Sequence, residues 1–178
     1  MEQKSWAKTL LTIYNCLENI TSAIDNLVLS QGINSGRNNL TTMESAQKII
    51  NLIQRKKMLI NLKVLTEKIV ASVDQLSARI LILKYFDRVK PEVIYNILNI
   101  SRRTYFRKLN TALENFGNKL KSEGYSSNVL KERLKNESWI IEMFENNLTK
   151  NEKESFEEEK NDEVLSFAIK KQKALKYC

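Results

Sequence analysis

Basic and hydroxyl side chains cluster in one short stretch of this sequence, between positions 101 and 111. Its members could all contact a nucleic acid: Ser101, Arg102, Arg103, Thr104, Arg107, Lys108 and Thr111. Arginine and lysine neutralise phosphates, and arginine can also donate two parallel hydrogen bonds to a guanine. The hydroxyl groups can bond either to phosphates or to base edges. The chemistry that these residue types favour is recognition, without making or breaking covalent bonds.

Two predicted helices, joined by a sharp corner, would position this cluster. Pro91 suits the first position of the first helix, because proline lacks the N–H that would go unpaired there. Asn99 can turn the chain through a left-handed conformation, and Ser101 is a good N-cap for the second helix. Between them, Ile100 can fill the corner from the inside. The sequence therefore predicts the corner at residues 99–101.

Each of the two helices has an apolar stripe that would hold it against the rest of the protein. The stripes are Ile94, Ile97 and Leu98 in the first helix and Tyr105, Leu109, Ala112, Leu113 and Phe116 in the second. The basic cluster lies on the other face of the second helix. This pattern is typical of a helix-turn-helix, whose second helix enters the major groove of double-stranded DNA. The alternative is an ordinary helical corner whose basic face is only solvated.

The residues before and around the corner resemble region 4 of sigma factors. Six residues are similar to the helix that opens that region: Leu76, Arg79, Ile80, Leu81, Lys84 and Tyr85. The Asn-Ile-Ser-Arg run at 99–102 resembles the Gly-Ile-Ser-Arg turn of the family, and the Ala-Leu pair at 112–113 resembles its closing Ala-Leu. Tyr95 and Asn99 depart from the family pattern, which usually has alanine and glycine there. Because of these departures, the two helices of the corner can cross at an angle that differs from that in a typical sigma domain.

The run SRRTYFR at 101–107 is more similar still to the sigma-like phage regulators of the ArpU type, in which such an aromatic pair recurs. The resemblance covers about a quarter of the chain. It implies a transcription regulator of a phage or mobile element that binds promoter DNA and contacts RNA polymerase. We find no clear aromatic-rich segment for melting a promoter. An activator or an atypical sigma factor is therefore favoured over a sigma factor in the full sense.

The composition favours an all-α protein with a polyanionic partner. The 178 residues include 4 glycines and 1 proline, too few for a sheet-rich fold with many turns. The net charge of +8 favours nucleic acid as a partner. Histidine is absent, and Cys16 and Cys178 are the only cysteines. We therefore expect no enzyme, no catalytic residue, no metal site and no cofactor.

The sequence also indicates where the protein resides. No apolar run reaches the roughly 18–20 residues that span a bilayer. Glu2 and Lys4 lead straight into an amphipathic helix, without the pattern of a signal peptide. With two cysteines and no disulfide framework, a reducing compartment fits best. We expect a cytoplasmic protein that does not enter a membrane.

A long helical hairpin is predicted ahead of the helix-turn-helix. Residues 5–29 carry an a/d heptad seam: Trp6, Leu10, Ile13, Leu17, Ile20, Ile24 and Leu27. A loop is predicted at 31–40, and Thr41 with Glu44 forms a capping box for a helix over 42–70. The apolar residues of this second helix are expected to fold back on the first: Met43, Ala46, Ile49, Ile50, Ile53, Ile60, Val64 and Ile69. Three roles stay open for the hairpin, namely homo-oligomerisation, polymerase docking and plain core packing.

Further boundaries follow from capping residues and composition. Ser72 with Gln75 is expected to open the helix-turn-helix unit, and Gly124 to stop its last helix. Ser126 or Ser127 is expected to cap one further helix with Leu130, Leu134, Ile141, Phe144 and Leu148 on its apolar side. The basic residues at 55–57 are expected to be solvated, with a phosphate contact as the alternative. The predicted organisation is a hairpin at 1–71, a helix-turn-helix domain at 72–124, a helical extension at 125–149, and a charged linker with a short helix at 150–178.

Two other classes of function remain as alternatives to a sigma-like regulator. One is a DNA-packaging or partition subunit similar to a small terminase, in which a helix-turn-helix joins helices that build a ring. The other is a helical protein that binds proteins and not DNA. The acidic segment at 150–163 is expected to be a solubilising linker, with masking of the basic face as its alternative.

Overall fold

A computed structural model of the chain describes residues 1–34 and 41–150, and 87% of these residues are helical. There is no strand within these two ranges, so the predicted all-α fold is confirmed. None of the helices found there is long and apolar enough to cross a bilayer. The expectations for the segment 35–40 and for everything after residue 150 lie outside the described residues.

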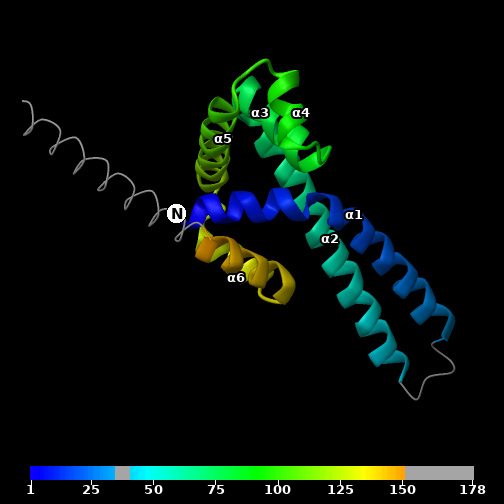
Figure 1. The fold of residues 1–178 in the computed structure, drawn as a ribbon. Coiled ribbons are helices and arrows are strands. Elements are labelled where there is room, and N and C mark those ends of the chain that lie inside the picture. Colours follow the sequence, from blue (N-terminus) through cyan, green and yellow to red (C-terminus); the bar gives the residue numbers. More distant parts are fainter. Residues whose placement is uncertain (35–40, 151–178) are drawn as a thin grey trace, which may run out of the picture.

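A hairpin of two long helices forms the largest part of the fold (Figure 1). Helix α1 (Glu2–Asn34) continues four residues into the expected loop, and α2 (Thr42–Ser72) returns beside it. The predicted capping box opens α2. The Glu44 N–H donates to Thr41 Oγ1 at 3.2 Å, and the Thr41 N–H donates to Glu44 Oε2 at 2.8 Å.

The seam predicted for α1 is buried over most of its length. Trp6, Leu10, Ile13, Leu17 and Ile24 are all at most 1% exposed. The seam ends there, because the next predicted member is 49% exposed (Leu27). The first part of this prediction is confirmed, and the part beyond Ile24 is wrong.

The predicted inward face of α2 is largely wrong. The residues that pack inward are Leu59, Leu62, Leu65, Thr66, Ile69 and Val70. Six of the expected residues are instead exposed: Met43, Ala46, Ile50, Ile53, Ile60 and Val64. Because α2 has apolar residues on two sides, periodicity alone could not show which side meets α1.

The predicted helix-turn-helix unit follows in four elements. These are α3 (Gln75–Leu81), a π-helical turn η1 (Ile82–Phe86), α4 (Pro91–Ile97) and α5 (Arg102–Ser122). Asp74, and not Ser72, caps α3, since its carboxylate accepts from the Ser77 N–H at 3.0 Å. The predicted stop is confirmed, because Gly124 has a φ of 87° just after the C-cap of α5.

Helix α1 passes between α5 and the C-terminal helices, as Figure 1 shows. The crossing with α5 is close because Gly117 has no side chain. A Cβ atom on Gly117 would lie 2.8 Å from the carbonyl oxygen of Gln3. On the other side of α1, the Trp6 ring stacks on Phe144, with the ring centroids 4.1 Å apart. The first turns of α1 therefore hold α5 and residues 138–150 together.

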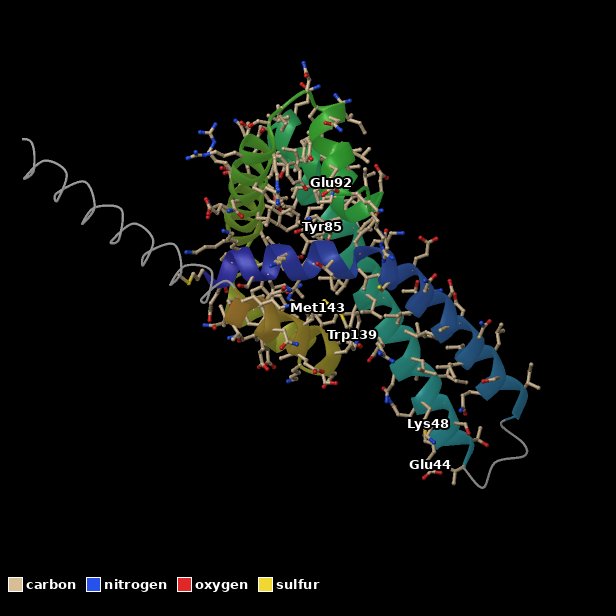
Figure 2. All side chains as sticks on the ribbon, viewed as in Figure 1. Glu44, Lys48, Tyr85, Glu92, Trp139 and Met143 are labelled. Carbon is tan, nitrogen blue, oxygen red and sulfur yellow. The ribbon has the colours of Figure 1, made fainter. Side chains whose placement is uncertain are left out.

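The expected single helix after Gly124 is in fact two. Helix α6 (Ser127–Leu134), with Ser126 as N-cap, ends in a turn, and a second helix occupies 138–150. Its Ile140 and Phe144 are buried, and Trp139 and Met143 are half-buried against the core (Figure 2). This apolar surface belongs to the core of the chain.

A buried carboxylate lies at the break between these two helices. Glu137 is 1% exposed and accepts from Arg55 Nε at 2.6 Å and Arg55 Nη2 at 2.9 Å. It also accepts from Trp139 Nε1 at 2.8 Å. Lys56 pairs with Asp25 at 2.6 Å. The expectation of a merely solvated basic group at 55–57 is therefore wrong for Arg55 and Lys56.

We expect Arg55→Met to lower the free energy of unfolding by about 2–3 kcal/mol near neutral pH, because it leaves the buried Glu137 carboxylate without its cation. Arg55 itself is 41% exposed, which keeps the loss below that for a fully buried pair. Urea denaturation of both proteins measures the difference. Lys56→Met is the matched control and should change stability much less, because its partner Asp25 is about half exposed.

The pH dependence of this loss tests its cause. Burial raises the pKa of Glu137, but the hydrogen bonds from Arg55 and Trp139 and the Arg55 charge bring it below its ordinary value. The stabilisation is therefore present above the pKa of the unfolded chain and is lost as pH falls through the lower folded pKa. Without Arg55, burial dominates and raises the pKa of Glu137. The difference between variant and wild type should shrink as pH falls to about 4, and a constant difference would contradict this assignment.

Candidate nucleic-acid interface

The corner between α4 and α5 has the predicted geometry. Asn99 adopts a left-handed conformation with a φ of 51°. Its N–H donates to the Asn96 carbonyl oxygen at 3.1 Å, and the Ile100 N–H donates to the Tyr95 carbonyl oxygen at 3.0 Å. The Ile100 side chain is half-buried against the core, as expected of a residue that fills the corner. These bonds close the last turn of α4 and point the chain into α5.

Ser101 caps α5 as predicted. Its hydroxyl oxygen accepts from the Thr104 N–H at 3.1 Å. The two hydroxyl groups of Ser101 and Thr104 also share a hydrogen bond at 2.9 Å. Thr104 is half-buried as a result, whereas Ser101 is exposed. These two hydroxyls are thus partly committed to the cap, although each oxygen can still accept a further bond.

Substitutions of Asn99 should show whether the corner requires a left-handed residue. Asn99→Gly should leave the free energy of unfolding unchanged or raise it by up to about 1 kcal/mol, because glycine adopts a positive φ without strain. Asn99→Val should lower it, since a β-branched residue tolerates that conformation poorly. Thermal denaturation compares the two variants. Equal stabilities of the valine and glycine proteins would show that the turn does not depend on a left-handed conformation.

The inner face of α5 anchors the helix in the core. All five residues predicted for this face are buried: Tyr105, Leu109, Ala112, Leu113 and Phe116. Of the stripe predicted for α4, Ile94 is buried and Leu98 half-buried, but Ile97 is 49% exposed. Helix α4 has only seven residues, and Ile94 is the one among them that is fully buried. The position of α5 is therefore fixed mainly by its own apolar face.

The outer face of α5 presents the predicted basic residues to solvent. Arg102, Arg103, Arg107 and Lys108 are all exposed, and none of them forms an ion pair with a described carboxylate. Thr111 is also exposed, and its hydroxyl donates to the Arg107 carbonyl oxygen at 3.1 Å. The structure thus brings all seven predicted residues to the first three turns of one helix. Four cationic groups there have no anionic partner among the described residues.

Two residues of this surface were missed by sequence reasoning. Phe106 is 43% exposed, and the Arg102 guanidinium lies 5.9 Å from the centre of its ring. Asn110 joins Arg103, Thr104, Phe106 and Arg107 around a hollow on this face. The spacing of 103, 107 and 110 is that of one helical strip, so periodicity could have found Asn110. Neighbouring residues of a helix point in different directions. Because Tyr105 was predicted to face the core, the sequence could have indicated that the adjacent Phe106 ring points outward.

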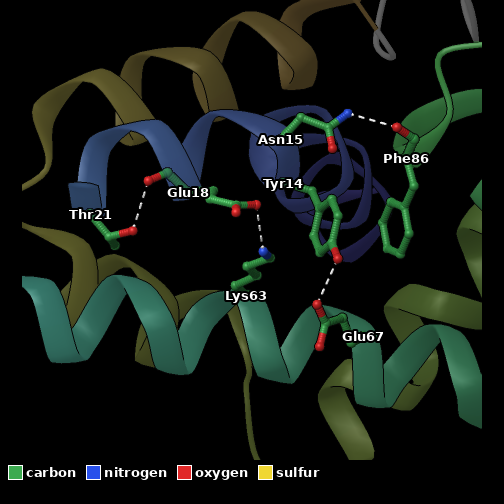
Figure 3. A network of polar contacts seen from close by, with 7 residues as sticks. All are labelled: Tyr14, Asn15, Glu18, Thr21, Lys63, Glu67 and Phe86. Carbon is green, nitrogen blue, oxygen red and sulfur yellow. Dashed lines mark hydrogen bonds and ion pairs between the residues drawn. The ribbon is translucent and has the colours of Figure 1, made fainter. Parts of the chain in front are cut away.

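A junction of polar and aromatic contacts holds the helix-turn-helix unit to the hairpin (Figure 3). The Asn15 side-chain amide donates to the carbonyl oxygens of Tyr85 and Phe86 at 3.0 and 2.9 Å. These carbonyls belong to η1, where a π-helical turn leaves backbone acceptors to satisfy. The Tyr14 ring stacks on Phe86 with a centroid distance of 3.7 Å.

The same junction continues into α2. The Tyr14 hydroxyl donates to Glu67 Oε1 at 2.6 Å, and Lys63 pairs with Glu18 at 3.1 Å. Burial, followed by the hydrogen bond to Glu67, raises the pKa of Tyr14 to about 12. Tyr14 therefore stays protonated and keeps donating at any physiological pH. The contacts tie α1, α2 and η1 together, so the hairpin fixes the platform on which α5 lies.

One protein family matches part of this chain. Residues 39–117 match the family described as "Protein of unknown function (DUF1492)". This segment includes α2, α3, η1, α4 and most of α5, and thus the corner and all seven predicted DNA-contacting residues. A search of curated proteins and of solved structures finds no match.

Proposed function

We propose that this protein is a DNA-binding transcription regulator that binds promoter DNA through α5. The observation that carries the proposal is the start of α5. There, a left-handed corner presents Arg102, Arg103, Arg107 and Lys108 on one exposed surface, without carboxylate partners among the described residues. An α-helix fits the major groove, and residues near its N-terminus reach the base edges. Arginines in that place supply both phosphate and guanine contacts.

The resemblance to sigma-factor region 4 makes this proposal more specific. The proteins it resembles contact RNA polymerase as well as DNA, so we include the polymerase as a proposed partner. The hairpin and the C-terminal helices offer the surfaces for that contact, because α5 is occupied with DNA. A sigma-like regulator of a phage or mobile element is the class that fits both features.

DNA binding by the full chain tests the first half of this proposal. Fluorescence anisotropy with a random-sequence duplex, between about 50 and 200 mM salt, should show a logarithmic slope of about −3 to −4 per binding unit. This slope corresponds to release of the counterions that four cationic side chains displace. Selection from a random library should then yield a preferred site. Absence of binding at the lowest salt concentration would contradict the proposal.

Affinity capture tests the polymerase half separately. The tagged chain is incubated with nuclease-treated host lysate, and RNA polymerase subunits are detected by immunoblotting. Recovery of polymerase after nuclease treatment supports direct contact, whereas recovery of capsid or portal proteins in its place would favour a packaging role. A variant in which Arg102, Arg103 and Arg107 are alanine serves as control, since a contact made by other surfaces should survive it.

A further inference from the structure

A row of exposed apolar residues runs along one side of α2. We call this row the outer seam, and its members are Met43, Ala46, Ile50, Ile53, Lys57, Ile60 and Val64. Met43 is 79% exposed, and the apolar members nearer the middle of α2 are about half exposed. Single exposed apolar residues are common, but a regular row of them marks an interaction surface.

The spacing of the outer seam is that of a coiled coil. Its members alternate at three and four residues over three heptads, from Met43 to Val64. At 1.5 Å per residue this gives a straight stripe of roughly 32 Å. Other sides of α2 carry the buried Leu59, Thr66 and Ile69, and α2 already packs beside α1. The hairpin does not need the outer seam for its own folding, so the seam is available to another helix.

The residues that flank the outer seam favour a second copy of the same chain. On one flank lie three amides, Gln47, Gln54 and Asn61, which can hydrogen-bond to the same amides of a partner. On the other flank lie Lys56 and Lys63, which are neutralised by Asp25 and Glu18 of the same hairpin. The flank with Lys56 and Lys63 therefore places no unbalanced charge against a copy of itself. On the amide flank, Gln54, Lys57 and Asn61 line one hollow with the exposed Arg133 of α6, which favours an arrangement that keeps the Lys57 and Arg133 groups of the two copies apart.

The charge of Lys57 favours an antiparallel alignment of two such helices. Lys57 is the one charged residue within the seam, and it forms no ion pair with the described carboxylates. A parallel pair in register would bring the two Lys57 ammonium groups together, which is unfavourable. An antiparallel pair can set Lys57 opposite the partner's Ala46, where the small side chain leaves room. The same alignment sets Ile50 opposite the partner's Ile53.

We infer that two copies of this chain associate through the outer seams of their α2 helices, antiparallel, so that two hairpins form one four-helix assembly. The interface is separate from α5, and the inference does not depend on DNA binding. Each copy keeps its corner and the outer face of α5 exposed. A dimer then carries two recognition helices, as helix-turn-helix proteins that bind paired half-sites do.

Mass in solution tests the association. Sedimentation velocity of the full chain should show a dimer, and the double variant Ile50→Glu/Ile53→Glu should weaken dimerisation by on the order of a hundredfold or more. Both residues are exposed in the isolated chain, so circular dichroism should show an unchanged helical fold. Val93→Glu is the matched control, because Val93 is equally exposed but lies on α4. A monomeric wild-type chain at about 100 μM, or a double variant that remains dimeric, would overturn the inference.

Cysteine cross-linking tests the alignment. In a Cys16→Ser/Cys178→Ser background, Ala46→Cys with Lys57→Cys should give disulfide-linked dimers under mild oxidation. Neither cysteine alone should do so, because in the antiparallel pair each residue meets the other position and not itself. Cross-linking by Ala46→Cys alone indicates a parallel pair and would overturn the proposed alignment. A dimer that none of these variants cross-links would place the interface away from the outer seam.

Discussion

Alanine in place of Arg102, Arg103 and Arg107 together is expected to remove specific DNA binding while leaving the fold intact. Arg103 and Arg107 lie on the exposed strip of α5, where each can make a bidentate contact to guanine worth about 1–3 kcal/mol. Arg102 lies next to the cap and against the Phe106 ring, so we assign it to phosphate. All three side chains are exposed and form no ion pair with a described carboxylate, so their loss should change the free energy of unfolding by less than about 0.5 kcal/mol each.

Single substitutions distinguish the two kinds of contact. Arg103→Ala and Arg107→Ala should each relax specificity at one base pair of the selected site. Arg102→Ala should instead weaken binding on all sequences and reduce the salt slope by about one unit. Anisotropy with the selected site and with random DNA, at two salt concentrations, measures both effects.

A charge-matched variant separates these contacts from general electrostatics. Lys48, Lys121 and Arg133 are also exposed and without an ion pair among the described residues, and they lie away from the start of α5. Their joint replacement by alanine removes the same charge and should weaken binding far less. If the triple variant at Arg102, Arg103 and Arg107 binds as tightly as the wild type, α5 does not contact DNA.

Trp6→Ala is expected to destabilise the fold more than the loss of the Arg55–Glu137 pair. Trp6 is fully buried, stacks on Phe144 at 4.1 Å, and donates from Nε1 to Ser127 Oγ at 3.0 Å. Its removal leaves a cavity where α1 meets the C-terminal helices, which typically costs about 3–5 kcal/mol. Chemical denaturation followed by circular dichroism measures the change.

Two further variants show which part of the Trp6 contact matters. Trp6→Phe loses the hydrogen bond to Ser127 but keeps an aromatic ring. It should therefore recover a large part of the free energy of unfolding that Trp6→Ala loses. Leu27→Ala changes another predicted seam residue of α1, but one that is about half exposed, and should cost little. A similar loss for Leu27→Ala and Trp6→Ala would contradict the observed end of the seam at Ile24.

The parts of this fold that depend on neighbouring residues could be predicted from the sequence. The capping box at Thr41, the left-handed Asn99 and the cap at Ser101 each involve hydrogen bonds over three or four residues, and all three are confirmed. The early seam of α1 is confirmed as well. It fails at Leu27 because a straight helix drifts by about 20° per heptad from a strict seven-residue repeat, so Val28 turns inward in its place.

Features that depend on distant residues could not be predicted. The break between α6 and the next helix contains no glycine or proline. It coincides with Glu137, whose partner Arg55 is 82 residues away. Asp74 caps α3 in place of Ser72 because α2 extends to Ser72 before the chain turns. For the surface proposed to contact DNA, the sequence predicted which side chains share one face of α5, but it missed Phe106 and Asn110.

The glycine at position 117 has a consequence for the replacement of α5 by the corresponding helix of another protein. Helix propensity alone would make alanine the better residue by about 1 kcal/mol. In this chain an alanine methyl group would collide with the backbone at Gln3, and neither helix could move without disturbing the other contacts of α1. A transplanted α5 must therefore bring glycine at this position, or the graft will tilt relative to the hairpin. A graft with a side chain there would hold the exposed basic face of α5 at a different angle to the hairpin.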